Sequence, residues 1–205
     1  MSAKTHWEQV YGSKPAQSVS WYQPHAANSI ALIKAAAADL DSRIIDIGGG
    51  ASTLVDDLLD LGYTNLSVLD LSAEALAVAR RRLGERAGSI HWIEGDITTI
   101  ALPRHGFDVW HDRAVFHFLT EPEQRAAYLE RVRHAVRPGG HVIVATFALD
   151  GPAQCSGLPV ARYTPEGLHD EFGAAFELIE HREEYHQTPA GNTQHFIYCF
   201  CLKAG

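Results

Sequence analysis

The sequence predicts a doubly wound α/β fold, in which helices cover both faces of a mostly parallel β-sheet. Short runs rich in β-branched residues alternate along the chain with segments that repeat apolar residues at helical spacing. This alternation is typical of strand-helix-strand units, whose strands pair in parallel. The first run also leads into three consecutive glycines, a turn that favours ligand binding at the end of such a strand. The expected strands are Arg43–Ile47, Leu66–Asp70, Ile90–Glu94, Phe107–His111 and His141–Phe147.

Capping residues indicate where the helices between these strands begin and end. Leucine and valine residues at helical spacing follow the glycine turn, and Gly62 stands where that helix would end. Ser72 is expected to cap the next helix. Thr120 and Glu123 form a T-x-x-E capping box, so a helix is expected over Glu121–Val136 until "RPGG" ends it.

Segments near the two ends of the chain add further elements. Residues 24–40 are alanine-rich and predict a helix before the first strand. Thr164 and Pro165 are expected to start a short helix after the fifth strand. Phe176–His186 and Gln194–Leu202 are predicted as two strands that only a TPAGN turn connects, and strands joined in this way pair antiparallel. The predicted sheet therefore has seven strands, of which the last is antiparallel.

Charge and composition argue against several classes of partner. A formal net charge of -8 gives nucleic acid no general attraction to the protein. No apolar run approaches the ~18 residues that a membrane-spanning helix needs, and the first residues lack a signal-peptide pattern, so we expect a cytoplasmic protein with no membrane partner. The three cysteines predict free thiols, and no tight pair of ligands indicates a metal site.

The stretch "RIIDIGGGAS" marks the expected ligand site. Gly48 and Gly50 belong to a turn that brings backbone N–H groups and a helix N-terminus close to a ligand. Acidic residues end the first two strands and follow the third, namely Asp46, Asp70 and Asp96. Asp70 lies about 20 residues beyond the glycines, where a carboxylate accepts hydrogen bonds from ribose hydroxyls. We therefore expect a ligand that contains adenosine and carries a positive charge.

A nicotinamide dinucleotide would use the same architecture. The fingerprint of that cofactor is incomplete here, because Thr53 occupies the position of its third glycine. An acid directly before the glycines also faces an amino group better than a pyrophosphate. A nicotinamide-dependent oxidoreductase is therefore kept as an alternative hypothesis.

Five motifs in order resemble those of class I S-adenosylmethionine-dependent methyltransferases: "IIDIGGGAS", "SVLDLS", "EGDI", "FDVWHDRAVFHFL" and "RPGGHVIVATF". The resemblance covers residues 43–147 and implies a Rossmann-like fold with S-adenosyl-L-methionine as cofactor. It places Asp46 near the methionine amino group, with Gly48 and Gly50 along the cofactor chain. It places Asp70 at the ribose and Asp96 with Ile97 at the adenine, and it adds Leu71 to the cofactor-binding residues.

Within this resemblance we expect residues 1–205 to form a single methyltransferase domain. The chain has 205 residues, 46% of them hydrophobic, which suffices for one core, and it contains no repeat or linker. Residues 1–40 would form an aromatic arm and a helix, and residues 41–150 the cofactor-binding core. Residues 151–205 would supply an acceptor-side loop, a short helix and the terminal strand pair.

The N-terminal arm, "HWEQVYGSKPAQSVSWY", resembles that of lysine methyltransferases acting on citrate synthase and elongation factor 1A. Those enzymes typically have "DKGT" after the fourth strand, whereas this chain has "DRAV", so the resemblance leaves the acceptor open. The arm is expected to close over the site, because methyl transfer needs alignment and exclusion of water. Tyr11 and Trp21 are predicted cofactor neighbours; the alternative is that these rings only anchor the arm.

Asp112 and His117 are the predicted catalytic residues, in a segment that borders the methyl-transfer site in this family. Asp112 would orient the acceptor or the cofactor amine, and His117 would remove a proton, since an unperturbed histidine pKa of about 6.5 suits that role. The alternative for His117 is a partly buried histidine that bonds to the backbone.

The acceptor is therefore left as a protein lysine or a small molecule. Cys155, Cys199 and Cys201 keep a metalloid methyltransferase as an alternative, although the last two alternate with apolar residues as in a buried strand. A weaker resemblance of the N-terminal arm to thiopurine and thiol methyltransferases keeps a thiol acceptor as another. A further alternative is a non-catalytic cofactor-binding partner of another methyltransferase. The sequence does not predict an oligomeric state.

Overall fold

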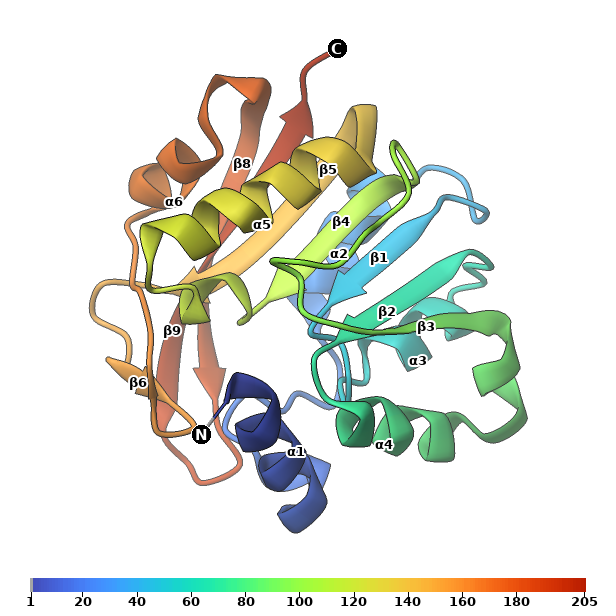
Figure 1. The fold of residues 1–205 in the computed structure, drawn as a ribbon, viewed down its shortest axis with the longest axis vertical. Coiled ribbons are helices and arrows are strands. Elements are labelled where there is room, and N and C mark those ends of the chain that lie inside the picture. Colours follow the sequence, from blue (N-terminus) through green and yellow to red (C-terminus); the bar gives the residue numbers. More distant parts are fainter. Residues whose placement is uncertain (1) are drawn as a thin grey trace.

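A computed structural model describes residues 2–205 and contains a seven-stranded sheet between two layers of helices (Figure 1). The strand order is β3-β2-β1-β4-β5-β9-β8. The order reverses between β1 and β4, and open α/β sheets bind ligands beside such a reversal. The strands are β1 (Ile44–Ile47), β2 (Leu66–Asp70), β3 (Ile90–Glu94), β4 (Phe107–Arg113), β5 (Val136–Phe147), β8 (Phe176–Gln187) and β9 (Thr193–Lys203).

The pairing directions confirm the predicted sheet. Strands β1 to β5 pair in parallel, while β9 is antiparallel to both of its neighbours, β5 and β8. Strand β5 begins at Val136, so "RPGG" lies inside the strand instead of between helix and strand as expected. A second, two-stranded sheet pairs β6 (Gln154–Cys155) with β7 (Leu158–Pro159) in the loop after β5.

The described residues form six α-helices that pack on the main sheet or beside its edge: α1 (Ala3–Ser13), α2 (Ala27–Ala36), α3 (Leu54–Asp60), α4 (Ala73–Leu83), α5 (Pro122–Ala135) and α6 (Pro165–Phe172). Alternate residues of each strand point to opposite faces. Ile44 of β1 joins the core beneath α2, α3 and α4, whereas its neighbour Ile45 joins the core beneath α5 and α6. No described helix is long and apolar enough to cross a membrane.

The helix caps agree with the sequence patterns with one exception. Ser72 accepts a hydrogen bond from the N–H of Ala75, and Thr164 caps α6 in the same way. The capping box of α5 is formed by Glu121 and Gln124, so the expected T-x-x-E box one residue earlier is wrong. Pro122 explains the shift, because proline fits the first helical position and thereby makes the preceding residue the cap.

Candidate active site

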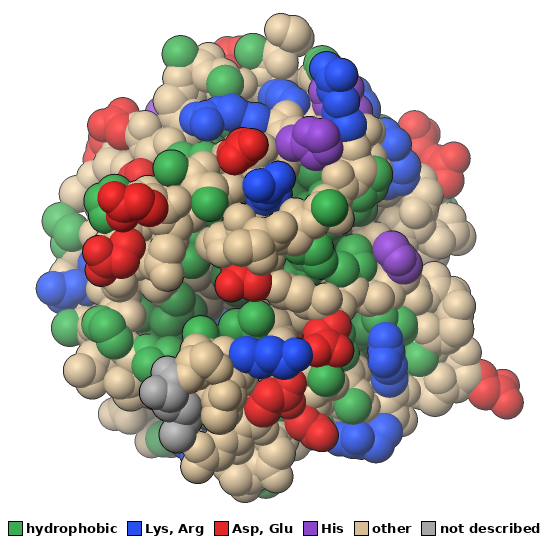
Figure 2. Space-filling model, in the orientation of Figure 1, with side chains coloured by type: hydrophobic (Ala, Val, Ile, Leu, Met, Phe, Trp, Pro, Cys, Tyr) green, Lys and Arg blue, Asp and Glu red, His purple; other side chains and the backbone are tan. Residues whose placement is uncertain are grey.

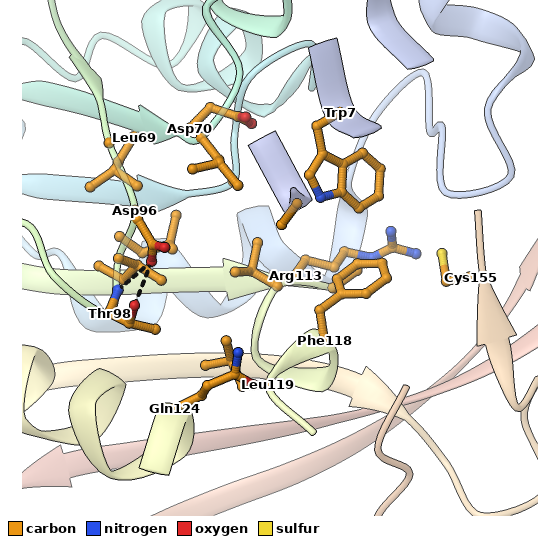
Figure 3. A pocket seen from close by; sticks show the side chains of 18 of the residues that line it. Trp7, Leu69, Asp70, Asp96, Thr98, Arg113, Phe118, Leu119, Gln124 and Cys155 are labelled. Atoms are coloured by element: carbon orange, nitrogen blue, oxygen red, sulfur yellow. Dashed lines mark hydrogen bonds between the residues drawn. The ribbon is translucent and has the colours of Figure 1, made fainter. Parts of the chain in front are cut away.

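A cavity of about 190 Å³ lies at the carboxyl ends of the central strands and under the N-terminal arm (Figure 3). The ends of β1 and β2 supply Ile47, Gly48 and Asp70 to its wall, and β4 supplies Arg113. Helix α1 lies beside this end of the sheet, and hydrophobic side chains gather next to it on the surface (Figure 2). The cavity therefore occupies the place at which the fold and the glycine turn predict a ligand.

The protein's own side chains occupy the space beside the glycine turn. A Cβ atom at Gly49 would lie 2.3 Å from Oδ2 of Asp46, and one at Gly50 would lie 2.4 Å from Oδ2 of Asp70. Gly48 has a φ of 68° and lines the cavity, whereas Gly50 does not line it. Gly50 thus makes room for a carboxylate of the neighbouring strand. Gly48 is the one glycine of this turn in the wall of the main cavity, but a Cβ atom there would lie 2.1 Å from Cγ2 of Val115, so a protein side chain also fills its side-chain space.

Asp70 is the buried carboxylate of the cavity wall. Its Oδ2 accepts a hydrogen bond from the N–H of Gly50 at 3.1 Å, and its Oδ1 accepts one from the N–H of Ser72 at 2.8 Å. Burial raises the pKa of Asp70 from 3.8 to about 7, although both N–H groups act in the opposite direction. A carboxylate has about four lone-pair sites, so two remain for ligand hydroxyls that would stabilise its charged form.

Asp46 lies in a buried chain of hydrogen bonds below the glycine turn. Nδ1 of His111 donates to Oδ1 of Asp46 at 2.7 Å, and Nε2 of His111 lies 2.8 Å from Oγ of Ser29. All three residues line a second, smaller cavity that shares Gly48 with the first. Asp46 is therefore not in the wall of the main cavity, and its charge has a partner that the sequence did not predict.

The other predicted cofactor residues line the main cavity. Leu71, Asp96 and Ile97 form one end of it, and Ile97 is buried. Oδ1 of Asp96 accepts hydrogen bonds from the N–H and the hydroxyl of Thr98 at 2.8 and 2.7 Å, as Figure 3 shows. Residues of three strand ends thus meet at one cavity, as the spacing of their motifs predicted.

The N-terminal arm forms the roof of the cavity. Tyr11 and Trp21, the predicted cofactor neighbours, both line it, with ring centroids 6.3 Å apart. Trp7 of α1 packs edge-on against Phe118 at 5.1 Å and joins the arm to the segment after β4. Glu8 fastens α1 to the rest of the protein, because its carboxylate accepts hydrogen bonds from the first N–H groups of α4.

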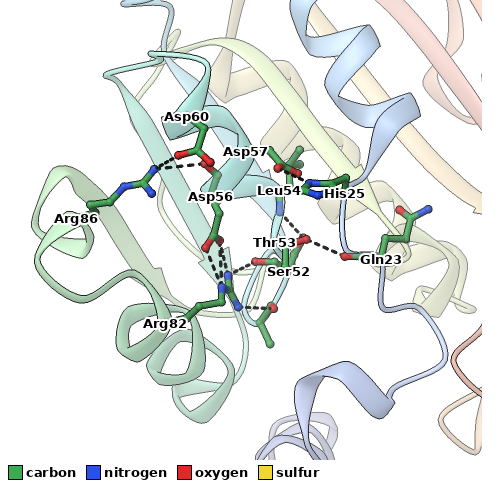
Figure 4. A network of polar contacts seen from close by, with 11 residues as sticks. Gln23, His25, Ser52, Thr53, Leu54, Asp56, Asp57, Asp60, Arg82 and Arg86 are labelled. Atoms are coloured by element: carbon green, nitrogen blue, oxygen red, sulfur yellow. Dashed lines mark hydrogen bonds and ion pairs between the residues drawn. The ribbon is translucent and has the colours of Figure 1, made fainter.

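A polar network holds the loop that follows the glycine turn (Figure 4). Arg82 of α4 forms an ion pair with Asp56 at 2.6 Å and also donates to the carbonyl oxygens of Ala51 and Ser52. The hydroxyl of Thr53 donates to the carbonyl oxygen of Gln23 at 2.8 Å, which joins this loop to the arm. The glycine turn is therefore fixed from both sides before any ligand binds.

The predicted catalytic residues, Asp112 and His117, do not line the cavity. Asp112 is fully buried and accepts hydrogen bonds from the hydroxyl of Tyr128 at 2.7 Å and from the N–H of Val115 at 2.9 Å. His117 is also fully buried, neither ring nitrogen has a hydrogen-bond partner among the described residues, and burial lowers its pKa to about 3. Their positions weigh against both catalytic roles and favour a packing role for His117.

One of the three cysteines belongs to the site. Cys155 lines the cavity, and burial raises the pKa of its thiol to about 11. Cys199 and Cys201 lie buried in β9, as their alternation with apolar residues predicted. Among residues 2–205, no group of three histidine, cysteine or acidic side chains is placed to hold a metal ion.

Comparison with known proteins identifies the family to which the central part of the chain belongs. Residues 44–140 match the family model described as "Methyltransferase domain". These residues form a class I S-adenosylmethionine-dependent methyltransferase domain. The matched range holds every strand end that contributes to the cavity, whereas the arm that roofs the methyltransferase domain lies outside it.

Curated relatives of the methyltransferase domain differ in what their names say they methylate. The chain is 31% identical over 109 residues to a ubiquinone/menaquinone biosynthesis C-methyltransferase of Methylobacterium nodulans, an alignment that covers 52% of this chain and 42% of that relative. It is 21% identical over 195 residues to EEF1A lysine methyltransferase 2 of Homo sapiens, covering 88% of this chain and 76% of the relative.

A solved structure shows that the fold likeness extends over the whole chain. The structure described as "Conversion of a Disulfide Bond into a Thioacetal Group during Echinomycin Biosynthesis" aligns with a TM-score of 0.78 and 20% identity. The alignment covers 99% of this chain and 93% of the other. This likeness includes the N-terminal arm and the terminal strand pair, which the family match leaves out.

Proposed function

We propose that the protein transfers a methyl group from S-adenosylmethionine to a small molecule held beneath the N-terminal arm. The observation that carries the proposal is the cavity itself: a buried carboxylate, Asp70, lies in its wall, and Trp7, Tyr11 and Trp21 roof it. Asp70 has hydrogen-bonding capacity left for ribose hydroxyls, so the residues present fit an adenosine-containing cofactor. When bound, S-adenosylmethionine supplies a methyl group on a sulfonium, which is a good leaving group.

The chain's own residues would bind, orient and dehydrate the reactants. We propose that Asp70 accepts from the ribose hydroxyls, that Leu71, Asp96 and Ile97 enclose the adenine, and that Gly48 lets the cofactor chain approach the backbone. The aromatic roof excludes water and aligns the acceptor; orientation alone can contribute on the order of 7–11 kcal/mol.

The chemistry of the cavity wall favours an acceptor that needs no strong base. No histidine, lysine or glutamate is among the described residues that line the cavity, and its two aspartates, Asp70 and Asp96, are the ones proposed to contact the cofactor. The thiol of Cys155 and the hydroxyl of Tyr11 both have raised pKa values because they are buried, so neither readily becomes an anionic base. We therefore propose that the acceptor enters with a free lone pair or loses its proton to water.

A protein lysine is the second candidate acceptor. It is supported by the human relative, whose name assigns it to lysine methylation and whose alignment covers most of this chain. The roof argues against this candidate, because Trp7 and Trp21 pack over the cavity and α1 is fastened to α4. A lysine side chain on a folded protein would need this arm to move aside.

Calorimetric titration of the full chain with S-adenosylmethionine, S-adenosylhomocysteine and NAD, repeated on Asp70→Ala, tests the cofactor. We expect the first two to bind and Asp70→Ala to abolish their binding. Methyl-labelled cofactor and a cell extract then test the acceptor, with label expected in the small-molecule fraction. Label in protein would favour lysine transfer, whereas cofactor binding without any transfer would favour a non-catalytic partner. Binding of NAD alone would refute the proposed function.

A further inference from the structure

Arg113, at the end of β4, has one nitrogen that finds no hydrogen-bond partner among residues 2–205. Its Nε donates to the hydroxyl of Tyr198 at 3.0 Å, and its Nη1 donates to the carbonyl oxygen of Trp21 at 3.2 Å. The guanidinium lies 4.1 Å from the ring centroid of Phe196. The side chain is only 8% exposed, and Nη2 is buried. Nη2 nevertheless has no hydrogen-bond partner among the described residues.

The nearest carboxylate balances the charge of Arg113 without satisfying Nη2. Oε2 of Glu184 lies 3.5 Å from Nε of Arg113 and accepts the hydroxyl hydrogen of Tyr198 at 2.5 Å. The other oxygen of Glu184 accepts from the side-chain amide of Gln23. A buried donor without a partner costs free energy, and that cost ends when a ligand oxygen reaches it.

Arg113 lines the main cavity on the side away from the predicted adenine end. Figure 3 shows its guanidinium between Trp7 and Phe118 and directed toward Cys155, whereas Asp96 lies at the opposite end with Asp70 between them. On the cavity side the guanidinium therefore lies between aromatic rings, and Arg113 is the one basic side chain in the described wall of this cavity. A flat molecule with a negatively charged oxygen fits this combination.

We propose that Arg113 determines acceptor specificity by pairing its Nη2 with a carboxylate or phenolate oxygen of a flat small-molecule acceptor. This inference rests on the proposed function, and it narrows the class of acceptor. A lysine ammonium is a poor occupant of the same place, because it carries only donors and a positive charge and would face another cation.

The sealed position of Nη2 predicts a small movement of the roof. Water has no access to this nitrogen in the closed arrangement. The arm lies next to the guanidinium, because the carbonyl oxygen of Trp21 accepts a hydrogen bond from its Nη1. We therefore expect the roof beside Arg113 to shift when an acceptor oxygen reaches Nη2.

Three probes that share one ring test the proposal: benzoate, benzamide and benzylammonium. Their binding to the protein saturated with S-adenosylhomocysteine is measured by ligand-observed NMR. We expect the order benzoate, benzamide, benzylammonium from tight to weak, with benzoate preferred over benzylammonium by about tenfold or more. Arg113→Gln should remove this preference. Glu184→Gln, which leaves the guanidinium in place without its balancing charge, should increase it.

A parallel titration of Arg113→Gln with two cofactor analogues tests whether the anion that pairs with Arg113 belongs to the acceptor or to the cofactor. S-adenosylhomocysteine carries a carboxylate, whereas 5′-methylthioadenosine lacks the amino-acid part. Unchanged affinity of Arg113→Gln for both supports the proposal. A loss of S-adenosylhomocysteine affinity alone would assign Arg113 to the cofactor and overturn it. Equal binding of the three probes, or no binding of any, would also overturn it while leaving cofactor binding and the proposed function intact.

Discussion

The pH dependence of cofactor binding follows from the burial of Asp70. Burial raises the pKa of this carboxyl to about 7, and only the ionised form accepts hydrogen bonds from two ribose hydroxyls. The pKa of Asp70 in the folded protein lies above the ordinary value of an aspartate, so protonation of Asp70 stabilises the ligand-free fold. This contribution to stability is lost as the pH rises through about 7. Cofactor binding instead becomes tighter as the pH rises, because it requires the ionised carboxylate of Asp70.

The size of the effect can be worked from the shifted pKa. With a pKa of about 7, roughly a tenth of Asp70 is ionised at pH 6 and roughly nine tenths at pH 8. The apparent dissociation constant increases by the inverse of the ionised fraction. We therefore expect S-adenosylhomocysteine to bind roughly tenfold more weakly at pH 6 than at pH 8.

Calorimetric titration of the wild type and of Asp70→Asn at both pH values measures this dependence. The amide of Asp70→Asn does not titrate, so this variant should bind weakly at both pH values and with a much smaller difference between them. Titration of the ligand affects both proteins alike and cancels in the comparison. Equal affinity of the wild type at pH 6 and pH 8, or the same pH dependence in the variant, would refute the assignment of Asp70 to the ribose.

Three further predictions concern the turn, the arm and the buried histidine. Gly50→Ala should destabilise the fold by about 1–3 kcal/mol in chemical denaturation, because its Cβ would meet a carboxylate at 2.4 Å, whereas Gly88→Ala, with no atom within 4 Å, should not. Glu8→Ala should weaken S-adenosylhomocysteine binding and speed proteolysis of the arm, since two helix N–H groups lose their partner, while Glu130→Gln on the surface should change neither. His117→Leu should keep methyl transfer and raise the free energy of unfolding by up to about 1 kcal/mol, because it removes two buried nitrogens without partners; a tenfold loss of transfer would restore the catalytic role.

The sequence predicted the elements that local patterns control. The strand Leu66–Asp70 has the expected bounds, because a short apolar run between turn signals is a local property. The helix that starts after Ser72 was predicted because a serine hydroxyl caps the N–H group three residues later. The α5 box was misplaced by one residue because two overlapping residue pairs fit the same pattern, and only the structure shows which one bonds.

The site was predicted as far as it depends on strand ends. Asp70, Asp96 and Gly48 meet at one cavity because the carboxyl ends of parallel strands lie along one edge of the sheet. The hydrogen-bond chain from Asp46 through His111 to Ser29 could not be predicted in this way. His111 and Ser29 lie 65 and 82 positions from their respective partners in the chain, so no spacing rule connects them.

The sequence by itself thus determined the strands of the sheet, the antiparallel pairing of the last two strands and the edge at which a cofactor is expected. These features follow from local periodicity, caps and turns. Only the tertiary structure decided the direction in which the side chains after β4 point. It placed Asp112 and His117 in the core, and it left Nη2 of Arg113, a residue of the cavity wall, without a partner in the described part of the chain. The physical reason is that burial and hydrogen-bond satisfaction depend on contacts among strands and loops far apart in the chain, which a single sequence does not display.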